Sequence, residues 1–193
     1  MKLRSLSALI LGAAGAVAIA ATGAQAAITV LGSGLAKSCY EAAEFGGEAH
    51  SGVLTCTSAL DDTALSMRDR GATLINRGIL RSRADDTEGA IADYNQGLHI
   101  DATLAEGYID RGAAYIVLHR YQDALGDLNK GIDMGARQPQ IAYYDRAIVN
   151  EALGNIRQAY EDYKKAVEIQ PDFTLAIDQL ARFRVVHKHP GGA

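Results

Sequence analysis

The sequence predicts an all-α protein built from stacked helical hairpins, and three observations lead to this prediction. A pattern of large and small residues recurs over residues 71–104, 105–139 and 140–173, in segments of 34, 35 and 34 residues. Apolar positions within each segment recur at steps of three and four residues, as the buried face of a helix requires. Turn-forming residues such as Gly154 and Pro171 stand where these helices must end. A constant period of this length is typical of proteins made of stacked repeats.

The register of residue sizes is the same in all three segments. The eighth position is small (Gly78, Gly112, Ala147), as are the twentieth (Ala90, Ala124, Ala159) and the twenty-seventh (Gly97, Gly131, Ala166). The twenty-fourth position is large (Tyr94, Leu128, Tyr163). We expect the small residues to let two antiparallel helices approach closely, while the large residues fill the space between them.

Two stretches carry the pattern most clearly. They are Tyr108-Ile-Asp-Arg-Gly-Ala-Ala-Tyr115 and Ala159-Tyr-Glu-Asp-Tyr-Lys-Lys-Ala166, the second of which is followed by Pro171. On these residues the sequence resembles the tetratricopeptide repeat (TPR), a helix–turn–helix unit with a period of about 34 residues. The resemblance implies a right-handed superhelix whose first helices line a concave wall. The eleventh position, usually aromatic in this family, departs from the pattern as Arg81 and Asn150.

The register extends to both sides of the three clear repeats. Gly52, Cys56 and Ala59 occupy positions twenty, twenty-four and twenty-seven of a degenerate first hairpin, in which Cys39 falls at position seven. The predicted organisation is a signal peptide over 1–26, a flexible segment over 27–34, the degenerate hairpin over 35–62, repeat 1 with an extended first helix over 63–104, repeat 2 over 105–139, repeat 3 over 140–173, a capping helix over 174–187 and a flexible tail over 188–193. An unrelated helical hairpin is the alternative for the first unit.

The start of the chain has the parts of a cleavable secretory signal peptide. A positive beginning with Lys2 and Arg4 precedes an apolar run over 6–21, and the Ala-Gln-Ala stretch at 24–26 has the small residues of a cleavage site. A membrane anchor is the alternative, but the run has about 16 residues, whereas a spanning helix needs about 20. We therefore expect a periplasmic or secreted protein that begins at Ala27 and is not inserted in a membrane.

The chain has two cysteines, Cys39 and Cys56, and an even count in an oxidising compartment favours a disulfide between them. The resemblance supports the same pairing, because positions seven and twenty-four face each other within a TPR hairpin. Two buried free thiols are the alternative. A disulfide between residues 17 apart would stabilise the fold by about 3 kcal/mol.

The charge balance makes two classes of partner unexpected. Without the signal peptide, 17 basic and 23 acidic residues remain, a net charge near −6. Nucleic-acid binding and attachment to an anionic membrane surface both need a basic patch, so neither is expected.

One Arg and one Asp recur sixteen residues apart in every repeat. The pairs are Arg77 with Asp93, Arg111 with Asp127 and Arg146 with Asp162. A catalytic carboxylate–guanidinium site is one interpretation. A structural ion pair between the two helices of each repeat is favoured, because a catalytic site is normally single whereas a framework feature repeats.

The resemblance also implies where a partner binds. In the family the concave wall is formed by positions two, five, nine, twelve and thirteen of the first helix, and here these include a mostly apolar set: Ile75, Ile79, Ile109, Ala113, Ile116, Ile141, Tyr144 and Ile148. An exposed apolar groove is typical of a surface that binds a protein or peptide. The alternative is that a second subunit or the N-terminal hairpin covers these residues. The Lys, Asn and Arg with which some family members hold a C-terminal carboxylate are replaced here, so an apolar or amphipathic segment is expected instead.

These features together predict an interaction protein. The first hypothesis is a periplasmic scaffold or adaptor that binds a segment of a partner protein in the groove. The second is a structural subunit of a cell-envelope complex that self-associates into a homo-oligomer. An enzyme is the third, but the sequence has no nucleophile elbow, phosphate-binding loop, zinc-protease motif or cysteine quartet. His187 and His189 are favoured as a solvated tail over a metal site, so no catalysis, metal or cofactor is expected.

Overall fold

The computed structural model describes residues 8–12, 26–30 and 34–187 of the 193-residue chain, and most of them lie in helices. The helices are α1 (Leu35–Phe45), α2 (Ala49–Leu60), α3 (Met67–Arg83), α4 (Thr87–Ile100), α5 (Ala105–Val117), α6 (Tyr121–Asp133), α7 (Pro139–Ala152), α8 (Ile156–Ile169) and α9 (Thr174–Leu180). Two strands, β1 (Ala8–Gly12) and β2 (Phe183–His187), pair antiparallel with Ala8 opposite His187. Within this described part, no helix is long and apolar enough to cross a membrane.

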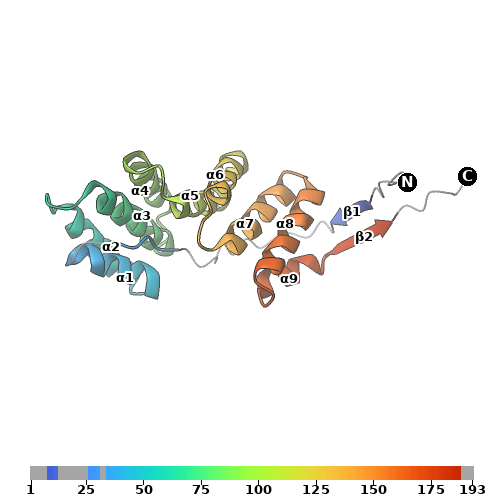
Figure 1. Ribbon diagram of the computed structural model, residues 1–193, viewed down its shortest axis with the longest axis horizontal. Coiled ribbons are helices and arrows are strands. Elements are labelled where there is room, and N and C mark those ends of the chain that lie inside the picture. The colour runs from blue at the N-terminus through green and yellow to red at the C-terminus, as the bar shows by residue number, and fades with distance from the viewer. Residues whose placement is uncertain (1–7, 13–25, 31–33, 188–193) are drawn as a thin grey trace, which may run out of the picture.

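The helices follow one another as antiparallel hairpins, and Figure 1 shows these stacked along one axis. The pair α1–α2 is the degenerate hairpin, and α3–α4, α5–α6 and α7–α8 are repeats 1, 2 and 3. The predicted all-α repeat array is therefore confirmed. The strands β1 and β2 lie beyond α8 and α9 at one end of the array. Strand β1 falls within the predicted signal peptide, the rest of which lies outside the described residues except for Ala26.

The small residues of the register lie where helices touch. A Cβ atom on Gly78 would lie 2.5 Å from the ring of Tyr94, and one on Gly131 would lie 2.3 Å from the side chain of Ile109. Both distances are far below van der Waals contact, so a larger residue at either position would force the neighbouring side chain or helix to move. The large residues at position twenty-four are fully buried, as predicted.

Helix α3 begins later than predicted within the added segment 63–70. Ser66 caps the helix, because its Oγ accepts the N–H of Asp69 at 3.1 Å. Only residues 67–70 therefore lengthen the helix, while 63–65 form a turn. Arg70 ties this first helical turn to the end of α2, because its Nη1 donates to the carbonyl oxygen of Leu60 at 2.7 Å.

The three predicted Arg–Asp pairs are present, and each joins the two helices of one repeat. Arg77 donates two hydrogen bonds to Asp93 (2.8 and 2.6 Å), Arg111 donates two to Asp127 (2.6 and 2.8 Å) and Arg146 donates two to Asp162 (3.0 and 2.7 Å). All three aspartates are buried. Two parallel hydrogen bonds fix the relative orientation of the charged groups, so each pair sets how the two helices of its repeat lie together.

Each arginine also contacts the preceding hairpin, a contact that was not predicted. Nη1 of Arg111 donates to Oδ1 of Asn95 at 2.7 Å, and Nη1 of Arg146 donates to Oδ1 of Asn129 at 2.8 Å. Both acceptors stand at position twenty-five of the previous repeat. One guanidinium group therefore joins three helices, and we call Arg77, Arg111 and Arg146 with their acceptors the arginine ladder.

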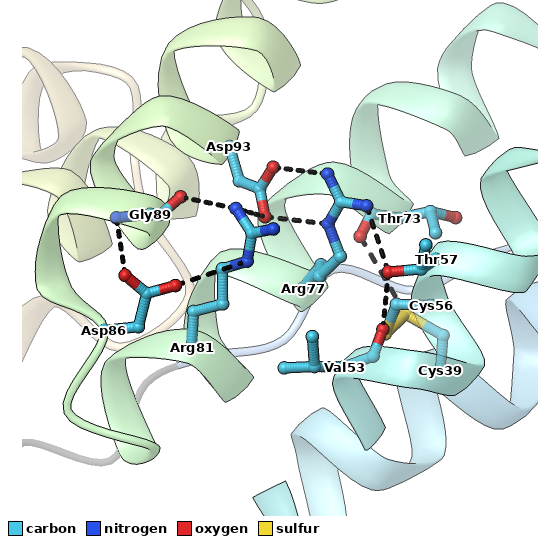
Figure 2. A network of polar contacts seen from close by, with 10 residues as sticks. All are labelled: Cys39, Val53, Cys56, Thr57, Thr73, Arg77, Arg81, Asp86, Gly89 and Asp93. Carbon is cyan, nitrogen blue, oxygen red and sulfur yellow. Dashed lines mark hydrogen bonds and ion pairs between the residues drawn. A yellow bond between two sulfur atoms is a disulfide. The ribbon is translucent and has the colours of Figure 1, made fainter. Parts of the chain in front are cut away.

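Figure 2 shows the first part of this ladder, where α2, α3 and α4 meet. Arg77 bridges Asp93 and the preceding hairpin, where its Nη1 donates to Oγ1 of Thr57 at 3.2 Å. Arg81 lies one turn later, with its Nη1 3.2 Å from the same Asp93 carboxylate and 3.0 Å from the carbonyl oxygen of Gly89. Arg81 stands where an aromatic residue was expected, and it places a second positive charge beside Asp93.

The predicted disulfide between Cys39 and Cys56 is present and joins α1 to α2, with Cα atoms 4.8 Å apart. Both cysteines are fully buried. Cys56 directly precedes Thr57, the acceptor for Arg77, so the disulfide holds the helix on which repeat 1 is stacked (Figure 2).

The predicted capping helix over 174–187 is wrong in its second half, where α9 gives way to strand β2. The ring of Phe183 packs against those of Tyr160 and Tyr163 on α8, with centroid distances of 5.7 and 5.9 Å. These contacts take the chain off the helical path, and the run of aromatic and β-branched residues that follows favours an extended strand. The predicted tail over 188–193 lies outside the described residues.

Replacing Arg111 by Ala is expected to destabilise the fold by about 3 kcal/mol, because Asp127 would keep a buried charge without its partner. Urea unfolding followed by circular dichroism measures this change. Lys164→Ala is the matched control, since its ion pair with Glu168 is exposed and should contribute less than about 1 kcal/mol. An unchanged unfolding midpoint in Arg111→Ala would contradict the structural role of the ladder.

Candidate functional site

The predicted groove residues do not form an open apolar wall. Ala113 is half-buried and the other seven are buried, including Ile79, Ile116, Ile141 and Ile148. Ile75, Ile109 and Tyr144 stand at position five and pack against the second helix of their own repeat, beside Gly97, Gly131 and Tyr163. The prediction is wrong for these three residues, because position five faces the interior of the repeat and belongs to the core.

The chain's own residues 27–30 lie against α3, near the start of α5 and the loop that precedes α7. We call the face that the first helices α3, α5 and α7 share the groove. The Ile28 N–H donates to Oδ1 of Asn76 at 2.8 Å, and Nδ2 of Asn76 donates back to the Ile28 carbonyl oxygen at 2.8 Å. All of this segment except Thr29 is buried. Residues 27–30 of the segment predicted to be flexible therefore lie packed against the repeats, while residues 31–33 lie outside the described part of the chain.

A second anchor holds the residue before Ile28. Arg137, in the loop between α6 and α7, donates from Nη2 to the carbonyl oxygen of Ala27. Its Nε and its backbone N–H both donate to Oε1 of Glu106, at 3.0 and 3.1 Å, which fixes the loop on α5. A pocket of about 380 Å³ adjoins these groups and Ile28, and the loops that precede α5 and α7 form part of its wall, so there is free space beside this segment.

The residue that holds Ile28 belongs to a series. Asn76, Asp110 and Asp145 stand at position six of three successive first helices, and all three are buried. The series was missing from the prediction. The sequence signal was present, however: one polar residue at a constant spacing of 34 and 35 positions on a helical face that is otherwise mostly apolar.

Asp110 and Asp145 hold carboxyl groups in surroundings that disfavour their charge. Oδ2 of Asp110 has no hydrogen-bond partner among the described residues. Burial raises the pKa of Asp110 well above its usual value, with Glu106 and Asp145 adding to the rise and Arg83 and Arg137 opposing it. Burial also raises the pKa of Asp145 to about 7.

These groups are suited to binding. An amide at position six can pair with a backbone N–H and C=O at once, and an unpaired buried carboxylate can accept hydrogen bonds from a cation. In the described part of the chain, no group of three or more His, Cys, Asp or Glu residues is placed to hold a metal ion.

The fold is expected to become more stable as the pH falls from 7 toward 5, because of Asp145. Its pKa is about 7 in the folded state against a usual 3.8, so the folded chain keeps a proton that the unfolded chain has released. The free energy of unfolding should rise on acidification by a few kcal/mol, on the order of 1.4 kcal/mol per unit of pKa difference. Asp145→Asn should reduce this rise.

Urea unfolding at pH 5 and pH 8 measures the effect. Asp172→Asn is the matched control, because Asp172 is exposed and should leave the dependence on pH unchanged. The same dependence in Asp145→Asn as in the unsubstituted chain would contradict a proton held at this residue.

Comparisons of the sequence with known proteins agree with this architecture. A sequence model of the family described as "Tetratricopeptide repeat" matches residues 141–173. Serine/threonine-protein phosphatase 5 of Rattus norvegicus is 36% identical over 90 residues, and that of Homo sapiens is 36% identical over 89 residues. These alignments cover 47% and 46% of this chain but 18% of each phosphatase, so the chain spans less than a fifth of their length.

Solved structures share the fold. MamA matches with a TM-score of 0.62 at 21% identity, covering 78% of this chain and 82% of MamA. YrrB, a TPR protein with an unusual peptide-binding site, matches with a TM-score of 0.58 at 26% identity, covering 65% of this chain and 62% of YrrB. The first TPR domain of Spaghetti (RPAP3), bound to the HSP90 peptide SRMEEVD, matches at 0.55 and 24% identity, covering 57% and 87%. With its repeat register, its stacked hairpins and the family match over residues 141–173, the chain has the fold of a tetratricopeptide-repeat superhelix.

Proposed function

We propose that the protein is an exported, non-catalytic scaffold whose groove binds an extended segment of a partner protein. Its TPR fold supports the general part of this proposal, because TPR arrays are typically interaction modules. The likeness to the phosphatases does not extend to catalysis, since it covers only 18% of their length.

The two hydrogen bonds between Asn76 and Ile28 carry the proposal. An amide that bonds the N–H and the C=O of one residue recognises the backbone of an extended chain, whatever its side chains. The segment 27–30 therefore represents the kind of ligand that the groove accepts. Two of the similar structures support this interpretation, since YrrB is named for a peptide-binding site and RPAP3 is bound to a peptide.

Residues 27–30 would compete with such a partner. They are part of the same chain, and a short link gives a tethered segment an effective concentration in the millimolar range. A partner must therefore bind more tightly than the segment does, or bind when the segment has left the groove. We expect displacement of 27–30 to accompany partner binding.

Binding in trans tests this proposal. In the chain that begins at Ala27, Ile28→Asp should remove the segment from the groove, because a buried apolar side chain is replaced by a charged one that is costly to bury. We expect this variant to bind the acetylated, amidated peptide Ala-Ala-Ile-Thr-Val, the sequence of residues 26–30, more tightly than the unsubstituted chain does. Isothermal titration calorimetry measures both affinities.

Adding Asn76→Ala to the Ile28→Asp variant should weaken peptide binding about tenfold or more, because two hydrogen bonds are lost. Gln96→Ala is the matched control, since Gln96 is an exposed amide on α4. Equal affinities in the Asn76→Ala and Gln96→Ala backgrounds would contradict recognition by Asn76.

The exported location rests on the signal-peptide pattern of residues 1–26 and is supported by the buried disulfide, which suits an oxidising compartment. Mass spectrometry of the protein recovered from cells should find a chain that begins at Ala27. A protein that retains Met1 or residue 2 at its start, recovered from the cytoplasm, would contradict export.

A further inference from the structure

The three residues at position six of the first helices differ in chemistry. Asn76 on α3 is satisfied by Ile28, whereas Asp110 on α5 and Asp145 on α7 are buried carboxyls, 2% and 3% exposed. Oδ2 of Asp110 has no donor within hydrogen-bond distance among the described residues. A buried acceptor without a partner is costly, so Asp110 is a position at which a bound donor would add stability.

The arginines near Asp110 leave this oxygen unpaired. Arg137 lies 3.0 Å from Glu106, which balances its charge, and it also donates to Ala27. Arg83 is exposed at the end of α3. Both lower the pKa of Asp110 through their charge, but the structure gives neither a hydrogen bond to Oδ2.

The direction of the bound segment shows which part of a ligand would reach Asp110. Ile28 lies on α3, while the carbonyl oxygen of Ala27 is held by Arg137, just before α7. From Ile28 to Ala27 the segment therefore leads from α3 toward the loop that precedes α7. Neighbouring packed helices lie about 8–10 Å apart and an extended chain rises about 3.3 Å per residue, so one repeat corresponds to about three residues.

We propose that the groove selects an extended partner segment with a basic side chain, Lys or Arg, about three residues before the residue that Asn76 holds. That basic group would bind Asp110, with Asp145 one repeat further along for a second one. This inference rests on the proposed function, because it assumes that a partner backbone takes the place of residues 27–30.

The chain's own segment lacks this feature. In the chain that begins at Ala27, no residue stands three before Ile28; in the uncleaved chain that residue is Gln25, and residues 20–26 contain no Lys or Arg. A partner with a basic residue there would gain a charge-assisted hydrogen bond that residues 27–30 cannot offer. The basic residue thus explains how a partner in trans could displace a tethered competitor.

The carboxyl groups of Asp110 and Asp145 also distinguish this groove from a groove that binds acidic ligands. The HSP90 peptide bound to RPAP3 reads SRMEEVD, with three acidic residues in its last four. Such a ligand would bring carboxylates toward Asp110 and Asp145, into surroundings that already raise the pKa of both groups and therefore disfavour further negative charge. We therefore expect basic, not acidic, segments to be selected.

Three acetylated, amidated peptides test the inference in the Ile28→Asp variant of the chain that begins at Ala27. Arg-Ala-Ala-Ile-Thr-Val has the sequence of residues 25–30 with Arg in place of Gln25, and the other two have Gln or Glu at that place. Acetylation removes the terminal ammonium, so the side chain is the only source of positive charge. We expect the Arg peptide to bind about tenfold or more tightly than the Gln peptide, and the Glu peptide to bind more weakly than both.

The double variant Asp110→Asn, Asp145→Asn should abolish the preference for Arg and leave the affinity for the Gln peptide within about twofold. Asp123→Asn, an exposed carboxylate on α6, is the control and should keep the preference. Equal binding of the Arg and Gln peptides, or a preference that survives in the double variant, overturns the role of Asp110 and Asp145 and leaves backbone binding by Asn76 standing. If no peptide binds, the proposed function fails and this inference fails with it.

Discussion

The array depends on the hydrogen bonds that the arginine at position seven of each repeat donates. Arg111 bonds Asp127 within its own repeat and Asn95 in the repeat before it. Folding of one hairpin and its stacking on the previous hairpin are therefore coupled through a single side chain. In repeat proteins the stability within a repeat and the stability between repeats are usually separate contributions. Here one guanidinium contributes to both, and the same geometry positions the first helices that form the groove.

The fold was predictable because its signals are local and periodic. The small Gly78 and the large Tyr94 predict a close contact between two helices from residue size alone. The spacing of 16 residues between Arg77 and Asp93 predicts their ion pair. The contacts between neighbouring repeats could not be predicted, because they depend on how the hairpins stack. The acceptor Asn95 is polar at a regular spacing, but nothing in its own repeat shows that it meets the arginine of the next one.

The site was predicted less well, for a related reason. An apolar residue such as Ile75 indicates a buried face without showing what covers it, and here α4 of its own repeat and α5 of the next repeat cover it. The segment that fills the groove pairs across 48 residues from Ile28 to Asn76 and across 110 from Ala27 to Arg137. No periodicity connects such distant residues. The polar series at position six was the readable sign of the groove, because a polar residue on a buried face needs a partner.

The number of residues between two contacting groups also affects when their contact can form during synthesis of the chain. The ladder pairs lie 16 residues apart, so each repeat can form soon after its residues are made. The contact of Ala27 with Arg137 must wait until most of the chain exists. Domains acquire structure as they emerge from the N-terminal side, so the repeats would assemble before their own leading residues fold back upon them. Each molecule then passes through a period with its groove vacant, and whatever it meets first in that interval has no internal competitor.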